Sequence, residues 1–189
     1  GVSESATSYF QAASSSGTSF VSPVEFLPDN RESYITFIAP VKDAEAMTIG
    51  YLRTRYDARI FQDMIEENVG ILGFRSYPIL VDENGIRLAD VYLPDQIYHS
   101  VTPLTDTQYS QLLSEHCIPA TITPENIAIS QTDFSKALSA PSSNPYFITS
   151  MKLLGADFSF SGVVKKINSR PWTVILLQDR TNLISSLAE

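Results

Sequence analysis

Apolar and polar residues alternate along the chain in short runs, and the clearest run covers residues 33–57, SYITFIAPVKDAEAMTIGYLRTRYD. Its first part is rich in β-branched and aromatic residues, which is typical of a strand. A polar turn at residues 42–45 leads to a second strand over residues 47–56. Asp57 is a suitable N-cap for a helix over residues 58–68, whose apolar side chains share one face. The pattern predicts a β-hairpin that leads directly into an amphipathic helix.

A second hairpin is predicted in the middle of the chain. Residues 77–81 and 86–91 form its strands, and Asn84-Gly85 suits its turn because this pair tolerates positive φ angles. The segment Thr105-Asp-Thr-Gln108 resembles a capping box and predicts a helix after it. The other expected elements are strands over residues 19–27, 146–153, 157–167 and 172–178, and short helices over residues 9–13 and 133–138.

Short turns join most of the predicted strands, and helices are inserted between them. Such an order favours antiparallel sheets in an α+β fold. Each half of the chain ends in antiparallel strands followed by an amphipathic helix, and Asp179 is expected to cap the last one. This final helix carries Leu183, Ile184 and Leu187 at helical spacing. It is expected either to dock on the sheet or to continue toward a membrane.

Composition and charge exclude several classes of partner. The chain has 189 residues and a net charge of −8, and its 13 Lys and Arg residues are not clustered. Nucleic acid is therefore not an expected partner, and anionic lipid is disfavoured. No apolar run approaches the roughly 18 residues needed to cross a membrane, and no signal peptide is visible. Because the chain begins with Gly, we expect any membrane anchor to lie outside it.

The sequence offers little catalytic or metal-binding chemistry. The single cysteine, Cys117, excludes an internal disulfide and a four-thiolate zinc site. Its neighbour His116 is adjacent in sequence, and such neighbours seldom face each other, so a buried structural thiol is expected. His99 has no second ligand at metal spacing, and phosphate loops and hydrolase motifs are absent. We therefore expect no enzymatic activity, no metal and no cofactor.

Two long segments resemble a known family. The first, FVSPVEFLPDNRESYITFIAPVKDAEAMTIGYLRTRYDARIFQDMI, resembles the distal module of double Cache sensor domains. In that family a strand ends in Ala-Pro-Val, here Ala39-Pro40-Val41, and the next strand begins with glycine, here Gly50. The second part of the match consists of LVDENGIRLAD and RPWTVILLQDRTNLISSL, which resemble the first hairpin and the last strand and exit helix of the membrane-proximal module.

The resemblance implies two PAS-like modules, each an antiparallel sheet flanked by helices. It places a partial distal module at residues 1–70 and a membrane-proximal module with its exit helix at residues 71–189. Only eight residues precede Tyr9, so the distal module is expected to be cut or to be built from three strands. The family consists of extracytoplasmic sensing regions that lie between two membrane helices of histidine kinases, chemoreceptors or cyclase-type receptors.

The resemblance also bears on the ligand. Amino-acid-binding members carry an Arg just before an aromatic pair, whereas here the pair Tyr9-Phe10 follows Thr7 and Ser8. They carry an Asp on the strand after the glycine, and the corresponding residue here is Arg55. A guanidinium at this position would repel the amine of an amino acid, so an anionic small molecule is the expected ligand.

Strand alternation gives the candidate binding face. Tyr51, Arg53 and Arg55 fall on one side of their strand, where two guanidiniums could hold a carboxylate. The full set of predicted ligand-binding residues is Tyr9, Glu25, Tyr34, Thr36, Tyr51, Arg53 and Arg55. The alternative is that both arginines lie on a solvated surface and pair with Glu25 or Glu45.

Three functions follow from this reading. The first is a ligand-sensing input domain of a membrane-bound signalling receptor. The second is a structural or protein-interaction module that forms a homodimer or contacts another protein, with its pocket filled by its own side chains. The third, a small α+β hydrolase, is disfavoured because no nucleophile has a catalytic partner.

Overall fold

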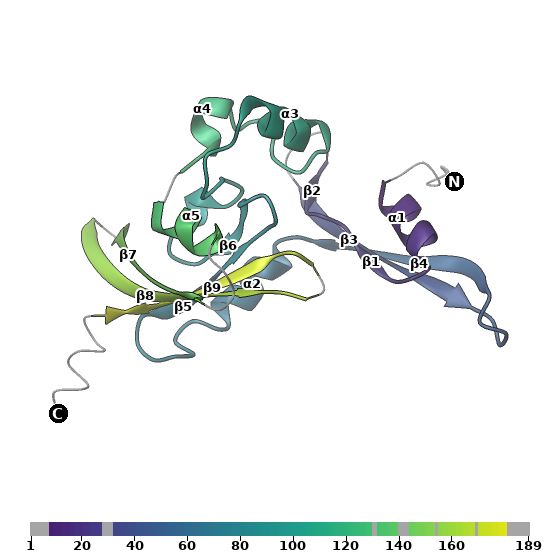
Figure 1. Cartoon of the computed structure of the whole chain (residues 1–189), viewed down its shortest axis with the longest axis horizontal. Helices are drawn as coiled ribbons and strands as arrows, with labels where there is room; N and C mark the ends of the chain where they lie inside the picture. Colours follow the sequence, from purple (N-terminus) through teal and green to yellow (C-terminus); the bar gives the residue numbers. More distant parts are fainter. Residues whose placement is uncertain are drawn as a thin grey trace.

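Two antiparallel sheets lie next to each other along the long axis of the molecule (Figure 1). The structure, a computed structural model, describes residues 8–27, 32–129, 132–139, 144–153, 155–168 and 170–180. The first sheet contains β1 (Phe20–Val21), β2 (Glu25–Phe26), β3 (Ser33–Lys42) and β4 (Thr48–Asp57). The second sheet contains β5 (Ser76–Val81), β6 (Arg87–Asp90), β7 (Tyr146–Leu153), β8 (Ala156–Lys166) and β9 (Thr173–Asp179). The helices are α1 (Ser8–Ser16), α2 (Ile60–Glu66), η1 (Pro94–Gln96), α3 (Asp106–Ser114), α4 (Pro124–Ile127) and α5 (Thr132–Ser139).

The first sheet is built on the predicted hairpin. β3 and β4 pair from Tyr34–Asp57 to Val41–Gly50, and a bulge follows before the turn. The Asp43 carboxylate closes this turn by accepting the N–H groups of Glu45 and Met47 at 3.1 and 2.8 Å. The other edge of β3 carries β1 and β2. The hairpin predicted from the alternation is therefore confirmed.

Two predicted elements of this half are wrong in their extent. The strand expected over residues 19–27 is divided into β1 and β2, because Pro23 has no N–H to donate to a neighbouring strand. At the break the Ser22 hydroxyl, in place of a backbone carbonyl, accepts the Thr36 N–H at 3.0 Å. The helix expected over residues 58–68 is shortened to α2. Asp57 does not cap it, since its carboxylate binds the N–H and the guanidinium of Arg59 instead.

The second sheet has the strand order β6-β5-β9-β8-β7 and encloses most of the core. All residues of β5 are buried, since α2 lies against β5 and β6 while Phe134 of α5 joins the apolar core on the other face. The capping box of α3 is present as predicted, with Thr105 and Gln108 bonded reciprocally. The predicted final helix falls on residues outside those described, and Asp179 is the last residue of β9.

A shared apolar core joins the two sheets. Its buried members come from the first sheet, from the α2 segment and from the second sheet: Val24, Phe26, Ile35, Ala58, Ile65, Leu80, Leu88, Ala89 and Trp172. Phe61 of α2 meets the Trp172 ring edge-on at a centroid distance of 5.1 Å. Burial of this apolar surface stabilises the contact between the sheets, because each fully buried large side chain contributes about 1.5–3 kcal/mol.

A buried ion pair lies within β6 beside this core, and Gln62 links it to α2. Arg87 and Asp90 are 1% and 0% exposed, and Nη1 of Arg87 lies 2.8 Å from Oδ2 of Asp90. Gln62 of α2 accepts the Asp90 N–H at 3.0 Å, and Asp90 Oδ1 accepts two further N–H groups. Loss of hydration lowers the pKa of Arg87 and raises the pKa of Asp90, and their mutual attraction opposes both shifts. The Asp90 carboxylate therefore depends on its partners to remain charged, whereas the Arg87 guanidinium stays protonated and needs a buried counter-ion.

Asp90→Ala is expected to lower the free energy of unfolding by about 3–5 kcal/mol, because it leaves the Arg87 guanidinium buried without its counter-ion. Urea denaturation monitored by circular dichroism measures this loss. The exposed turn variant Glu45→Ala is the control and should change stability by less than about 0.5 kcal/mol. The double variant Arg87→Met/Asp90→Leu should be more stable than Asp90→Ala. Wild-type stability in Asp90→Ala would contradict this interpretation of the pair.

Candidate functional site

The structure brings most of the predicted binding residues to one face of the first sheet. Residues paired directly across an antiparallel ladder point to the same side. The register pairs Tyr34 with Glu25 across one edge of β3, and Thr36 with Arg55 across the other. Six of the seven predicted residues have this orientation: Glu25, Tyr34, Thr36, Tyr51, Arg53 and Arg55. We call this surface the Arg55 face.

Glu25, Tyr34 and Arg55 form a linked cluster on the Arg55 face. The Tyr34 hydroxyl donates to the Glu25 carboxylate, and the Arg55 guanidinium carbon lies 4.0 Å from the centroid of the Tyr34 ring. Loss of hydration raises the pKa of Glu25, while the hydrogen bond from Tyr34 and the charge of Arg55 oppose the rise. Arg55 is exposed, so the cluster presents a held guanidinium at an open surface. The arrangement contains features of both predicted alternatives, an attraction between Arg55 and Glu25 and an accessible cation.

Thr36 lies at the centre of this face and has an incomplete set of hydrogen bonds. Its side chain is 0% exposed, and among the described residues its hydroxyl has no hydrogen-bond partner. Its backbone is held by Ser22, whose N–H donates to the Thr36 carbonyl at 2.9 Å. A buried hydroxyl without a partner costs about 1–3 kcal/mol. Because this hydroxyl is fully buried beside Arg55, a ligand atom can satisfy it only when the side chains that cover it move apart, and only the structure reveals this.

Tyr51 has a structural contact in addition to its place on the Arg55 face. Its ring meets Phe10 of α1 edge-on at 5.1 Å, next to a small core formed by Ala13 and Ile38. Tyr51 therefore holds α1 over the distal part of the face. Tyr9 belongs to the same helix, and its side chain is outside the part that the structure describes.

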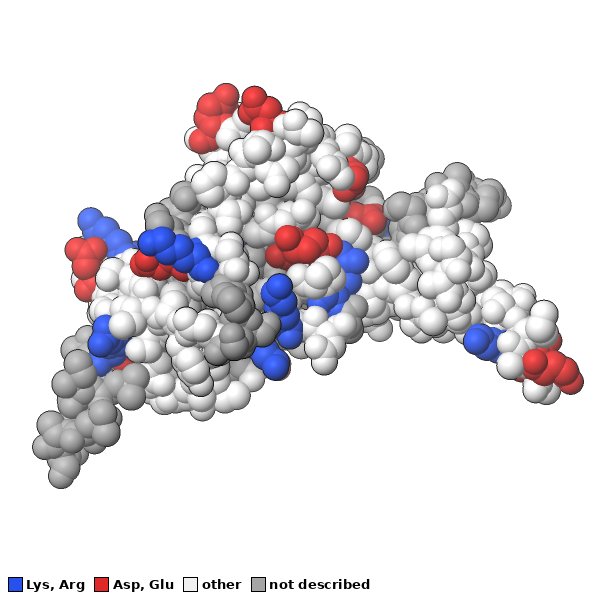
Figure 2. All heavy atoms as spheres, viewed as in Figure 1, with Lys and Arg blue, Asp and Glu red and all other residues white. Residues whose placement is uncertain are grey.

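Arg53 of β4 is the second cation of the face and lies opposite Ile38 of β3. Like Arg55, it is exposed. β4 pairs only with β3 among the described strands, so both arginines stand on an edge strand. Figure 2 shows acidic and basic side chains interspersed over the visible side of the molecule, with no continuous basic patch there. The arginines are thus a local cationic feature of an acidic chain of net charge −8.

The single cysteine of the chain belongs to a buried apolar cluster. Cys117 is buried, and burial raises the pKa of its thiol to about 12, so the nucleophilic thiolate is suppressed. No group of three His, Cys, Asp or Glu side chains among the described residues could hold a metal ion. None of the described helices has the length and apolar character needed to cross a bilayer.

Comparison with known proteins identifies the fold. No protein-family profile and no curated protein matches the sequence. Among solved structures, the periplasmic domain of RsbU from Chlamydia trachomatis is similar, with a TM-score of 0.57 and 11% identity over 92% of this chain and 60% of that one. The ligand-binding domain of the Pseudomonas fluorescens chemoreceptor CtaA, in complex with L-isoleucine, has a TM-score of 0.54 and 13% identity over 98% of this chain and 62% of that one.

The chain has the fold of an extracytoplasmic sensor domain. A third similar structure is the ligand-binding domain of the Pseudomonas aeruginosa amino acid chemoreceptor PctC in complex with GABA, with a TM-score of 0.50 and 14% identity over 95% of this chain and 64% of that one. Others are extracellular domains assigned to histidine kinases. The predicted α+β architecture, with antiparallel sheets flanked by helices, is confirmed. This chain spans about 60% of the length of the sensor domains it resembles.

Proposed function

We propose that this chain is the small-molecule-sensing input domain of a membrane-bound signalling receptor, exposed outside the cytoplasm. The observation that carries the proposal is the similarity of 98% of the chain to a chemoreceptor domain whose structure contains a bound ligand. In this proposal residues 1–70 form the distal, ligand-binding module. Residues 71–189 form the membrane-proximal module, and flanking helices anchor the receptor.

The proposed ligand is a small organic acid without an amino group, bound at the Arg55 face. L-isoleucine and GABA, which are bound by two of the similar domains, each carry an ammonium group and a carboxylate. On this chain a guanidinium fork can bind a carboxylate in a bidentate manner, whereas an ammonium group beside Arg55 would be repelled. The Thr36 hydroxyl supplies a further polar contact when the side chains that bury it move apart.

The proposed signal passes through β3. Ser33 and Ile35 alternate with the binding residues Tyr34 and Thr36, and they point to the opposite face of the strand. Ile35 belongs to the shared core, and the Ser33 hydroxyl is 2.6 Å from the Tyr98 hydroxyl of the second half. A ligand that binds one arrangement of β3 more tightly would therefore shift the equilibrium between two positions of the sheets.

Thr36→Val is expected to change protein stability and ligand affinity in opposite directions. Removing the unpaired hydroxyl should raise the free energy of unfolding of the unliganded protein by about 1 kcal/mol. It should also weaken binding of the organic acid about tenfold, equivalent to about 1.4 kcal/mol. A thermal-shift screen of mono- and dicarboxylates identifies the acid, and calorimetry then measures its affinity for wild type and variant.

The double variant Arg53→Ala/Arg55→Ala should lose this binding, and Lys136→Ala is the control. Lys136 is an exposed cation on α5, away from the first sheet, so its removal should leave the affinity unchanged. An acid that binds the double variant as tightly as wild type would exclude the Arg55 face as the site. If no carboxylate binds wild type, the proposed ligand class is wrong.

A second candidate function is self-association through β4, which the exposed apolar surface of this strand favours. Ile49 and Leu52 of β4 are 67% and 63% exposed, and Met47, just before the strand, is 66% exposed. On the side opposite the Arg55 face, Phe37 and Tyr56 line an open groove together with Ile60 and Met64 of α2. An edge strand with such side chains can pair with the same strand of a second copy around a twofold axis.

Leu52→Lys is expected to convert the resulting homodimer into a monomer, because it places a charge in the paired edge. Sedimentation velocity at high protein concentration measures the change, with Arg59→Ala as the control that should remain dimeric. A wild-type protein that is monomeric at every concentration would exclude this function and leave the sensing proposal unaffected.

A further inference from the structure

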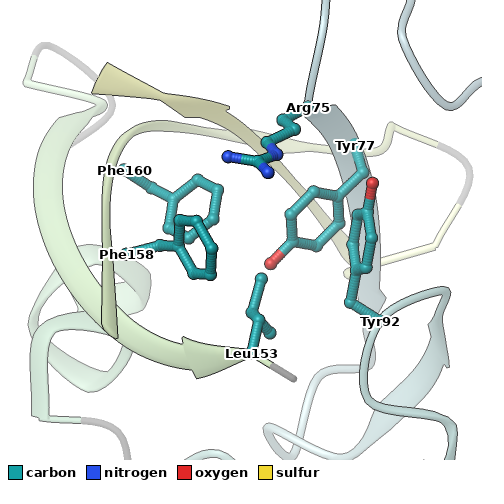
Figure 3. A pocket seen from close by; sticks show the side chains of 6 residues that line it. All are labelled: Arg75, Tyr77, Tyr92, Leu153, Phe158 and Phe160. Carbon is teal, nitrogen blue, oxygen red and sulfur yellow. The ribbon is translucent and has the colours of Figure 1, made fainter. Parts of the chain in front are cut away.

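The second sheet contains a cavity of its own, away from the Arg55 face. Figure 3 shows its lining, in which four aromatic rings and one leucine surround the space and an arginine lies over it. The lining residues are Arg75, Tyr77, Tyr92, Leu153, Phe158 and Phe160. The cavity has a volume of about 60 Å³ and opens to solvent at its mouth. It is smaller than the range of about 300–1,000 Å³ that is typical of small-molecule sites, so it suits only a small ligand whose polar end stays at the mouth.

The walls of the cavity belong to the packed core of the second sheet. Tyr77 and Phe160 are 0% and 1% exposed, and their rings meet edge-on at 5.8 Å. Tyr92 packs against Tyr77 at 4.5 Å, and Phe158 is tilted against Phe160 at 6.4 Å. These contacts hold the rings in place from the core side. The apolar space between them is therefore preformed, as is usual for small-molecule sites.

Arg75 is the one charged residue of this lining. Its guanidinium points inward over the rings in Figure 3, and its carbon lies 4.9 Å from the centroid of Phe158. Nη1 donates to the fully buried carboxylate of Asp179 at 3.2 Å, while the Arg75 side chain is 44% exposed at the mouth. This bond engages one of the five N–H donors of the guanidinium, and the fork geometry suits a carboxylate.

The backbone at Arg75 adopts an unusual conformation. Its φ angle is +57°, in the left-handed region that residues other than glycine seldom adopt. Such residues are concentrated at binding and catalytic sites, where the surrounding structure maintains them. Here the Asp179 N–H donates to the Arg75 carbonyl at 3.4 Å, and the Asp179 carboxylate binds the side chain. Asp179 thus fixes both the backbone and the guanidinium of Arg75 at the mouth of the cavity.

We propose that this cavity is a second ligand site, which binds a small monocarboxylate with an apolar ring or branched chain. The apolar body would fill the space between the aromatic rings, and the carboxylate would face Arg75 at the mouth. Asp179 would disfavour dianions by like-charge repulsion. The site lies on the second sheet and shares no residue with the Arg55 face, so it stands independently of the sensing proposal. A ligand that competes with Asp179 for Arg75 would act directly on the end of β9.

Benzoate is the probe for this site, with benzyl alcohol as the neutral analogue of similar shape. Methyl NMR of Leu153 and Met151 reports on the cavity, since Leu153 lines it and the Met151 sulfur lies 3.9 Å from the Tyr77 hydroxyl. Benzoate should shift these methyl signals in a saturable manner. Benzyl alcohol should bind at least about tenfold more weakly, because it lacks the charge that Arg75 recognises.

Arg75→Asn should weaken benzoate binding about tenfold or more, and asparagine is chosen because it tolerates a positive φ angle. This variant leaves Asp179 buried without its cation, so Arg75→Asn/Asp179→Asn is measured as the balanced variant. Leu153→Phe should abolish binding by filling the cavity. In Arg53→Ala/Arg55→Ala the benzoate-induced shifts of the Leu153 and Met151 methyl signals should be the same as in wild type, which distinguishes the two sites.

Any of three results would overturn the proposal. The first is the absence of saturable shifts at Leu153 and Met151 in the wild-type protein. The second is unchanged benzoate affinity in the folded Arg75→Asn/Asp179→Asn variant. The third is the loss of these shifts in Arg53→Ala/Arg55→Ala while Leu153→Phe still binds benzoate, which would assign the binding to the Arg55 face.

Discussion

The shared apolar core is the contact on which the rest of the structure depends. It packs Phe26 and Ile35 of the first sheet against Trp172 and Leu88 of the second, with α2 beside them. The first sheet has little other core, since β4 is largely exposed and α1 covers only its distal part. The position of β3 is therefore set by the second sheet. Successive residues of a strand point to opposite faces, so β3 carries binding residues on one side and core residues on the other. A ligand on the Arg55 face that displaces β3 must therefore also alter the packing of the shared core.

The two candidate sites both depart from what stability alone would favour. The Thr36 hydroxyl is buried without a partner among the described residues, and Arg75 has a left-handed backbone. Each departure carries a cost, of about 1–3 kcal/mol. In natural proteins, residues that break the usual rules of burial, hydrogen bonding or backbone conformation are found most often at functional positions. The surrounding structure there offsets the loss of stability. Here the offset comes from Ser22, which holds the Thr36 backbone, and from Asp179, which holds Arg75.

Local patterns in the sequence predicted the hairpins and the capping box of α3, because strand alternation and capping depend on neighbouring residues. The same alternation placed Tyr51, Arg53 and Arg55 on one face. It failed at Pro23, where the loss of an N–H divides a strand, and it could not show that the Thr36 hydroxyl lacks a partner. The cavity below Arg75 was missed because its walls come from strands distant in sequence. The register of those strands is a property of the folded sheet.

Fluorescence of Trp172 gives the most direct test of coupling through the shared core. Trp172 is the only tryptophan of the chain, and it lies in this core, away from the Arg55 face. Binding of the organic acid should change its emission in a saturable manner, with the dissociation constant found by calorimetry. The change should disappear in Arg53→Ala/Arg55→Ala. Binding that calorimetry detects on the Arg55 face, with Trp172 emission unchanged, would contradict the coupling of the two sheets.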